Sequence, residues 1–173
     1  MKTLQKWMNK EPDVLDWSYA TKIAAEIEGC GVKWEEKEED VRKRIKHILK
    51  CDTSNENLTD PVILRNADCV FSFCVLEQIS ENLDAFHANV KKIALMLKPG
   101  GCLLLVSELI ATHYIVAEHK YHILNHDEAD VRTALQNAGF TVEQWEVIES
   151  KIRNDNIYYE YVLFACAVKK RDI

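Results

Sequence analysis

The part of the sequence that most constrains the fold is residues 80–108, where a long helical pattern turns abruptly into a strand pattern. Apolar residues recur at helical spacing over residues 80–97, and Ser80 is expected to cap this helix. Residues 98–101 (Lys-Pro-Gly-Gly) end it, because proline cannot continue a helix and glycine accepts a positive φ. The apolar residues 102–108 then predict a strand, so we expect the chain to belong to the α/β class.

Helix and strand patterns continue on both sides of this unit. The further expected helices span residues 2–10, 17–27, 35–47 and 127–138, and the further expected strands span residues 48–52, 67–76, 140–148 and 157–168. The loop between the last two strands is short, which favours an antiparallel hairpin at the carboxyl terminus. The sequence therefore predicts a single α/β domain over residues 1–173, with parallel crossovers and a terminal hairpin in one mixed sheet.

Charge and composition narrow the classes of function. The 173-residue chain carries a net charge of −6, which argues against a nucleic-acid partner, because such binding depends on clustered Lys and Arg. No apolar run approaches the roughly 18 residues of a membrane-spanning helix, so no membrane partner is expected. The six cysteines form no CxxC pair, and four of them lie in apolar runs, which favours free thiols and a cytoplasmic location.

Four histidines follow the strand pattern of residues 102–108. They are His113, His119, His122 and His126. They have no regular ligand spacing and no neighbouring cysteine, whereas metal binding needs ligands that converge at fixed distances. A solvated loop or the lip of a pocket is the favoured interpretation, and no metal site is expected.

Several short motifs occur as an ordered series along the chain. They are Asp16-Trp17-Ser18, Leu49-Lys50-Cys51-Asp52, Ala67-Asp68-Cys69-Val70, Leu97-Lys98-Pro99-Gly100-Gly101, Tyr114 with Glu118, and Ala138-Gly139-Phe140-Thr141-Val142-Glu143. The series resembles the nicotinamide, phenylethanolamine, indolethylamine and thioether methyltransferase family, from near Trp7 to near Lys169. The resemblance implies a partial class I (Rossmann-like) sandwich that uses S-adenosyl-L-methionine to methylate small amines or pyridine-type nitrogen acceptors.

The resemblance assigns three residues to the cofactor. Asp52 matches the acidic residue that accepts a hydrogen bond from the adenine amino group, and Thr53 matches its neighbour, which makes a backbone contact. Phe73, near the carboxyl end of an expected strand, matches a residue of the cofactor cleft, and open α/β sheets bind their ligands at such ends. A turn residue at a strand end is the alternative interpretation of Asp52.

Three further residues are implied in acceptor binding. Glu77 stands where amine-methylating members place a carboxylate, which would hold a cationic amine or take its proton. Tyr114 matches a tyrosine of the acceptor pocket, and Ser107 stands where nicotinamide-methylating members carry an aspartate, which argues against nicotinamide as the substrate. A solvent-facing Glu77 and a merely packed Tyr114 are the alternatives. Methyl transfer in this class depends on positioning, so no catalytic residue is assigned.

The sequence lacks one part that the resemblance implies. Family members carry a glycine-rich cofactor turn ahead of the position of Met1, whereas the five glycines here form no such turn. Without the two strands that go with it, residues 48–52 and 67–76 would stand roughly 14 Å apart and expose apolar edges. We therefore expect an amino-terminally truncated enzyme that self-associates through its sheet edges. A non-catalytic methyltransferase-like binding or regulatory protein is the alternative.

Overall fold

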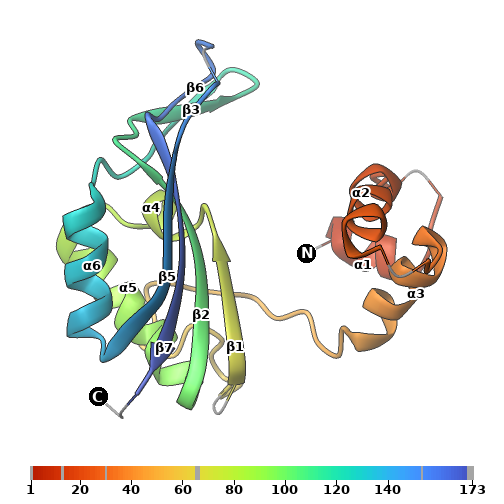
Figure 1. Cartoon of the computed structure of the whole chain (residues 1–173), viewed down its shortest axis with the longest axis horizontal. Coiled ribbons are helices and arrows are strands. Elements are labelled where there is room, and N and C mark those ends of the chain that lie inside the picture. The colour runs from red at the N-terminus through yellow and green to blue at the C-terminus, as the bar shows by residue number, and fades with distance from the viewer. Residues whose placement is uncertain (1, 13, 30, 65–66, 153, 171–173) are drawn as a thin grey trace. The chain divides into compact units, whose positions relative to one another are not determined.

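The computed structural model describes residues 2–12, 14–29, 31–64, 67–152 and 154–170. The chain divides into two compact units, Met1–Cys51 and Asp52–Ile173. The first unit is helical and the second contains all the described strands (Figure 1). Within these described ranges, no helix combines the length and the apolar character needed to cross a bilayer. The single domain expected over residues 1–173 stays a prediction.

The first unit contains three helices. They are α1 (Lys2–Met8), α2 (Ser18–Glu28) and α3 (Trp34–Arg44). Gly29 ends α2 with a φ of 61°, a left-handed conformation that glycine adopts without strain. Arg42 joins α3 to α1, because its guanidinium lies 4.3 Å from the centre of the Trp7 ring. Within α3, the same guanidinium pairs with the Glu38 carboxylate at 2.7 Å.

The strand expected over residues 48–52 is not formed. Residues 45–52 have no regular secondary structure, and none of the described strands pairs with them. A strand needs a neighbour for its backbone hydrogen bonds, so an apolar pattern alone does not produce one. Asp52 instead begins a turn, in which its carboxylate accepts hydrogen bonds from the backbone N–H of Ser54 at 3.2 Å and from its hydroxyl at 2.6 Å.

The second unit is built on a four-stranded sheet with the order β1-β2-β7-β5 (Figure 1). Its strands are β1 (Ala67–Phe73), β2 (Leu97–Leu109), β5 (Phe140–Glu149) and β7 (Tyr161–Lys169). β1 is parallel to β2, and β7 is antiparallel to both β2 and β5, which confirms the mixed sheet and the terminal hairpin. β1 ends at Phe73, before the expected residue 76, because a helical turn, α4 (Leu76–Ile79), follows it.

A second, three-stranded sheet was not expected from the sequence. It has the order β4-β3-β6 and consists of β3 (His113–Val116), β4 (His119–His122) and β6 (Ile157–Tyr158). These strands are short, and β4 is exposed along its whole length. Apolar alternation, the main sequence signal for a strand, is therefore absent from β4.

The helix expected over residues 80–97 is α5 (Leu83–Met96), and its cap is not the predicted Ser80. Asn82 is the cap, since its side chain accepts a hydrogen bond from the Ala85 N–H at 2.9 Å. Ser80 directly follows α4 and is buried, where its hydroxyl accepts a hydrogen bond from the Asn89 amide at 3.1 Å. The predicted helix stop at residues 98–101 is confirmed, because α5 ends at Met96.

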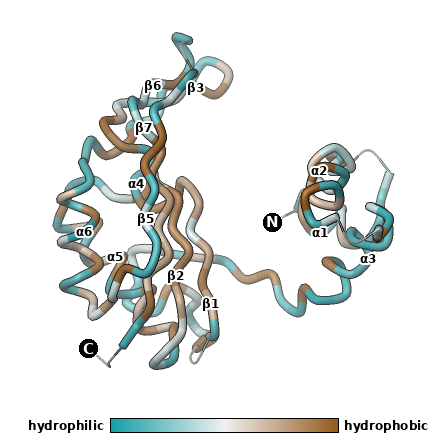
Figure 2. The backbone as a smooth tube through the Cα atoms, viewed as in Figure 1, coloured by the Kyte–Doolittle hydropathy of each residue, from teal (hydrophilic) through white to brown (hydrophobic). Residues whose placement is uncertain are grey.

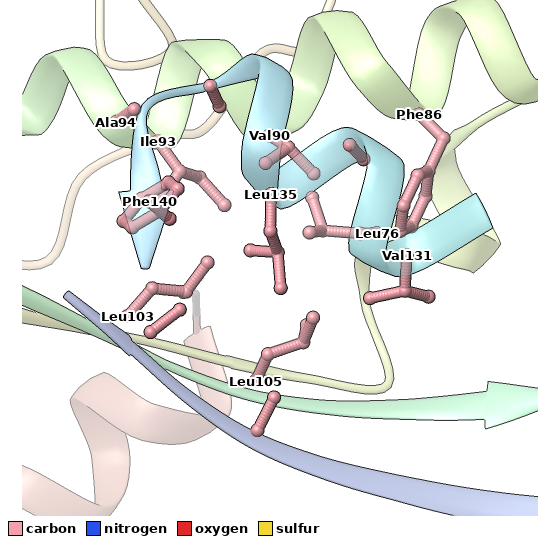
Figure 3. Close-up of a cluster of buried hydrophobic side chains, with 14 of the residues drawn as sticks. Leu76, Phe86, Val90, Ile93, Ala94, Leu103, Leu105, Val131, Leu135 and Phe140 are labelled. Atoms are coloured by element: carbon pink, nitrogen blue, oxygen red, sulfur yellow. The ribbon is translucent and has the colours of Figure 1, made fainter. Parts of the chain in front are cut away.

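Helix α5 and helix α6 (Glu128–Asn137) pack against the same face of the sheet (Figures 1 and 3). Their apolar side chains meet alternate residues of β2 and β7, among them Leu103, Leu105 and Leu163, all with no exposed surface. Figure 2 shows the hydrophobic colour along β2 that this burial requires. On the edge strand β1, by contrast, the rings of Phe71 and Phe73 remain 65% and 52% exposed.

Candidate functional site

Buried polar side chains gather where β1 and β2 end. After Phe73, Cys74 takes a φ of 50° and leads into α4, which carries Glu77, while Glu108 lies next to the last residue of β2. The sulfur of Cys74 and carboxylate oxygens of Glu77 and Glu108 lie within 4.8 Å of one another. Open α/β sheets bind ligands at the carboxyl ends of parallel strands, so this cluster is the candidate site.

Backbone contacts fix Glu77 in place. Its Oε1 accepts a hydrogen bond from the backbone N–H of Glu108 at 2.9 Å, and its carbonyl accepts one from the N–H of Leu124 at 2.9 Å. The preceding turn is held by the Cys74 N–H, which donates to the carbonyl of Val106 at 2.8 Å. Helix α4 is therefore tied both to β2 and to the segment before α6. The alternative of a solvent-facing Glu77 is wrong, because the residue has no exposed surface.

Two carboxylate oxygens of the cluster have no hydrogen-bond partner among the described residues, Oε2 of Glu77 and Oε2 of Glu108. Burial raises the pKa of Glu77 to about 7, and the neighbouring Glu108 carboxylate adds to the increase. Burial likewise raises the pKa of Glu108, and it raises the pKa of the Cys74 thiol to about 12. Unpartnered buried acceptors are costly, so this site is suited to a ligand with several N–H donors.

Ser107 and His126 form a hydrogen-bonded pair behind the carboxylates. The Nδ1 of His126 lies 3.0 Å from the Leu124 carbonyl, and its Nε2 lies 3.1 Å from the Ser107 hydroxyl. Nδ1 must carry a hydrogen because it faces a carbonyl. Burial lowers the pKa of His126, so the neutral ring accepts at Nε2 and Ser107 donates. The Ser107 side chain also lies close to the Glu77 carboxylate, so the structure brings the two predicted acceptor residues together.

The other histidines occupy the small sheet rather than this cluster. His113 and His122 face each other across the β3–β4 ladder, and His113 is hydrogen-bonded to the Thr112 hydroxyl at 2.8 Å. In the described part of the chain, the set of side chains with metal-ligand spacing is Cys74, Glu77 and Glu108, which includes no histidine.

Tyr114 also lies in the small sheet. Its ring stacks on Tyr121, with centroids 5.0 Å apart and planes at 15°. The sheet is anchored near Glu77, because the Ile123 N–H donates to the Thr112 carbonyl at 3.2 Å and the next residue is hydrogen-bonded to Glu77. Tyr114 is therefore a packed aromatic, and its role in acceptor binding stays a prediction.

The predicted cofactor residues are not all brought together. Phe73 lies beside Cys74 at the carboxyl end of β1, with its ring half exposed. The Thr53 carbonyl instead accepts a hydrogen bond from the Lys92 ammonium at 2.7 Å, and Lys92 lies in the last turns of α5, close to where β2 begins. Asp52 and Thr53 thus lie toward the opposite end of the sheet from Phe73.

The sequence interpretation missed three members of the site, Cys74, Glu108 and the role of His126. Glu108 carried a usable signal, because it is a charged residue inside an otherwise apolar strand pattern. Cys74 and His126 carried none, since their importance comes from contacts between segments distant in the sequence.

Comparisons with known proteins place the chain in a family. Residues 1–170 match the model of the NNMT/PNMT/TEMT family. The chain is 39% identical to indolethylamine N-methyltransferase of Oryctolagus cuniculus, covering 82% of this chain and 54% of the relative. It is 35% identical to nicotinamide N-methyltransferase of Homo sapiens, covering 86% and 56%, and 34% identical to phenylethanolamine N-methyltransferase of Macaca mulatta, covering 80% and 50%. The chain thus spans about half the length of these relatives.

Solved structures confirm the fold. An S-adenosylmethionine-dependent methyltransferase of Clostridium acetobutylicum aligns with a TM-score of 0.51 at 13% identity, covering 80% of this chain and 72% of that chain. A SAM-dependent methyltransferase of Methanosarcina mazei aligns with a TM-score of 0.50 at 16% identity, covering 68% and 66%. The cofactor implied by the sequence resemblance is the one on which these proteins depend. The chain belongs to the NNMT/PNMT/TEMT family of methyltransferases.

Proposed function

We propose that this chain is an S-adenosyl-L-methionine-dependent N-methyltransferase that acts on small amines or pyridine-type nitrogen acceptors. The observation that carries the proposal is Glu77, a fully buried carboxylate at the carboxyl end of β1 whose Oε2 has no partner among the described residues. Relatives named for methylation at nitrogen, at 34–39% identity, support the reaction type.

The chemistry of Glu77 suits this reaction. S-Adenosyl-L-methionine, when bound, supplies a methyl group on a sulfonium sulfur, and the acceptor nitrogen must present a free lone pair to it. An amine that arrives protonated must first lose a proton, and a carboxylate with a pKa of about 7 accepts one near neutral pH. Ser107, held by His126, lies beside Glu77, and we assign Tyr114 to the same acceptor site.

Of the three predicted cofactor residues, only one lies where a cofactor cleft is expected. Phe73 fits a cofactor cleft, because its ring is half exposed at the carboxyl end of β1. Asp52 and Thr53 do not fit it here, since Thr53 is held by Lys92 and the Asp52 carboxylate is engaged by Ser54. Their predicted contacts with adenine require the loop of residues 52–64 to take a different position.

Methyl transfer is the direct test of the proposal. The purified chain would be incubated with S-adenosyl-L-methionine carrying a labelled methyl group and with a panel of primary amines and pyridines. We expect label to appear in an acceptor, and we expect Glu77→Gln to lower kcat/KM by at least about tenfold, the effect of losing a positioned acid–base group. Glu81→Gln, which removes an exposed carboxylate near α4, is the matched control. Absence of labelled product with every acceptor would overturn the proposal.

A second candidate function is a non-catalytic binding protein. It is favoured by the edge strand β1 with its exposed Phe71 and Phe73. Such an edge supports self-association, which we propose for this chain together with a cytoplasmic location. Calorimetric titration with S-adenosylhomocysteine separates the candidates, because binding near micromolar favours the enzyme and its absence favours the binding protein.

A further inference from the structure

Two cysteines lie opposite each other near the start of the ladder between β1 and β2. Cys69 pairs directly with Cys102 in the parallel register, and both are free thiols. Neighbouring strands lie about 4.8 Å apart, which falls within the roughly 4.4–6.8 Å that separates the Cα atoms of a disulfide. We propose that Cys69 and Cys102 form a disulfide when hydrogen peroxide oxidises the protein. This modification site goes beyond the proposed function, since it involves none of the residues assigned to the acceptor or the cofactor.

The alternation of side chains along the strands places both thiols on the same face of the sheet. On β2, Leu103 and Leu105 point toward the core under α5 and α6, so Cys102 points to the opposite face. On β1, Val70 packs against the same core, so its neighbour Cys69 also points to the opposite face. Both cysteines are half-buried there. The two thiols are therefore neighbours that a small oxidant can reach.

A third cysteine on this face, Cys166 of β7, is not placed for the same bond. It pairs with Leu104, two residues beyond Cys102, so it is a diagonal neighbour of Cys102 across the antiparallel ladder. Diagonal neighbours lie roughly 7–8 Å apart, beyond the range of a disulfide. Cys69 is one strand further from Cys166. The register thus selects the bond between Cys69 and Cys102 over either bond to Cys166.

The surroundings of the pair give the two thiols different roles. Burial raises the pKa of Cys69 to about 11, and the nearby Cys102 and Cys166 side chains add to the increase. Cys69 therefore keeps its proton at neutral pH, whereas the thiolate is the form that attacks a peroxide. Cys102 accordingly takes the first step of the oxidation, and Cys69 supplies the second sulfur.

The oxidation proceeds in two balanced steps. The Cys102 thiolate attacks one oxygen of hydrogen peroxide, the O–O bond breaks, hydroxide leaves, and Cys102 becomes a sulfenic acid. The Cys69 sulfur then loses its proton and attacks the Cys102 sulfur, so that the S–S bond forms while the S–O bond breaks. The departing hydroxide takes up a proton as water. Two thiols are oxidised to one disulfide, and one peroxide is reduced to two waters.

The disulfide would fasten the edge of the sheet. Among the described strands, β1 pairs with β2 alone, so nothing on its other side holds it in the sheet. The bond would close a loop over residues 69–102, which contains α4 and α5, and would restrict the unfolded chain. Oxidation should therefore raise the thermal stability. Phe73, where β1 ends, lies four residues from Cys69, or about 13 Å along the strand, so the bond forms away from the carboxylate cluster.

The test is peroxide treatment of the full chain, followed by alkylation of the remaining thiols, digestion and mass spectrometry. We expect a peptide that joins Cys69 to Cys102, is reversed by dithiothreitol, and is retained in the control variants Cys51→Ser and Cys166→Ser. The oxidised protein should unfold at a Tm at least about 5 °C above that of the reduced protein. Cys69→Ser should leave Cys102 as a sulfenic acid that dimedone traps, whereas Cys102→Ser should leave Cys69 unmodified. Thermal unfolding of each reduced variant verifies that it is folded.

Several results would overturn the inference. Peroxide that links Cys166 to either thiol, or that joins two copies of the chain, would contradict the selection by register. A Tm that oxidation leaves unchanged would show that no bond holds β1 to β2. A dimedone adduct on Cys69 in Cys102→Ser would contradict the order of the two steps. Methyl transfer by the reduced protein tests the proposed function alone, so the two accounts fail separately.

Discussion

Two stretches of strand β2 are buried to a similar extent, but one carries apolar side chains and the other polar ones. In the middle of the strand, Leu103 and Leu105 have no exposed surface and pack against α5 and α6 (Figure 3). At its carboxyl end, Ser107 and Glu108 are buried to nearly the same extent, yet one is tied to a histidine and the other leaves an acceptor unpartnered. The first stretch stabilises the fold, whereas the second costs stability because a buried acceptor has no partner among the described residues.

The comparison predicts opposite signs for substitutions in the two stretches. Removing an apolar side chain from the middle should destabilise the protein at every pH, because it leaves a cavity. Removing charge from the carboxyl-end cluster should stabilise the protein while abolishing ligand binding, as is common where a site is built at the expense of stability.

The largest effect is expected for Leu105→Ala. The side chain is fully buried between the sheet and both helices, so its loss should lower the free energy of unfolding by about 4 kcal/mol. Urea denaturation measures this change. Leu95→Ala, at a position that is 51% exposed on α5, is the control and should cost less than about 1 kcal/mol. Equal losses in the two variants would contradict the proposed packing of the core.

The next largest effect is expected for Glu77→Gln, with a sign that depends on pH. The folded protein holds the Glu77 proton up to a pKa of about 7, whereas the unfolded chain releases it near the ordinary value of 4.5. Ionisation of Glu77 therefore costs stability progressively as pH rises between these values, by about 3 kcal/mol in total. The variant should be more stable than wild type by about that amount at pH 8 and equal to it at pH 4. Urea denaturation of both proteins between pH 4 and pH 8 measures this stability difference. A difference that does not change with pH would show that the pKa of Glu77 is not raised.

A smaller loss is expected for Ser107→Ala. The substitution leaves Nε2 of the buried His126 without its donor, which should lower the free energy of unfolding by about 1.5 kcal/mol. ¹⁵N NMR of the His126 ring gives an independent readout, because wild type should show the tautomer protonated at Nδ1. A ring protonated at Nε2 would contradict the assigned direction of the hydrogen bond.

The smallest effect is expected for Asp127→Ala at the start of α6. Asp127 accepts a hydrogen bond from the Asp130 N–H, and the Asp130 side chain accepts one from the Asp127 N–H, each at 3.0 Å. Losing this capping box should cost about 1 kcal/mol in thermal or urea unfolding. Asp84→Ala, in the first turn of α5 where Asn82 is the cap, serves as the control and should cost a few tenths of that.

Those parts of the fold that rest on local signals could be predicted from the sequence. The helix-stop-strand unit from α5 into β2, the helix α6 and the terminal hairpin all follow from residues close together in the chain. The prediction of a strand at residues 48–52 was wrong, because a strand depends on a pairing partner elsewhere in the chain, which a local pattern does not reveal. Strand β4 is polar and exposed, so neither apolar alternation nor an apolar run indicated it in the sequence.

The candidate site was predictable only in part. The family resemblance identified Glu77 and Ser107, which the structure brings together, but it assigned no role to Glu108. The contribution of Glu108 depends on β1 and β2 ending side by side, which juxtaposes two carboxylates 31 positions apart in sequence. Asp52 and Thr53 show the converse, since their match to the family did not place them beside Phe73.

The most direct measurement is a ¹³C NMR titration of the glutamate side-chain carboxyls between pH 3 and pH 10, with Glu77→Gln and Glu108→Gln to assign the signals. The account predicts that the pKa of Glu77 lies near 7 and that of Glu108 lies above its ordinary value. Two carboxyls that both titrate near the ordinary value of 4.5 would contradict a buried carboxylate pair at the ends of β1 and β2.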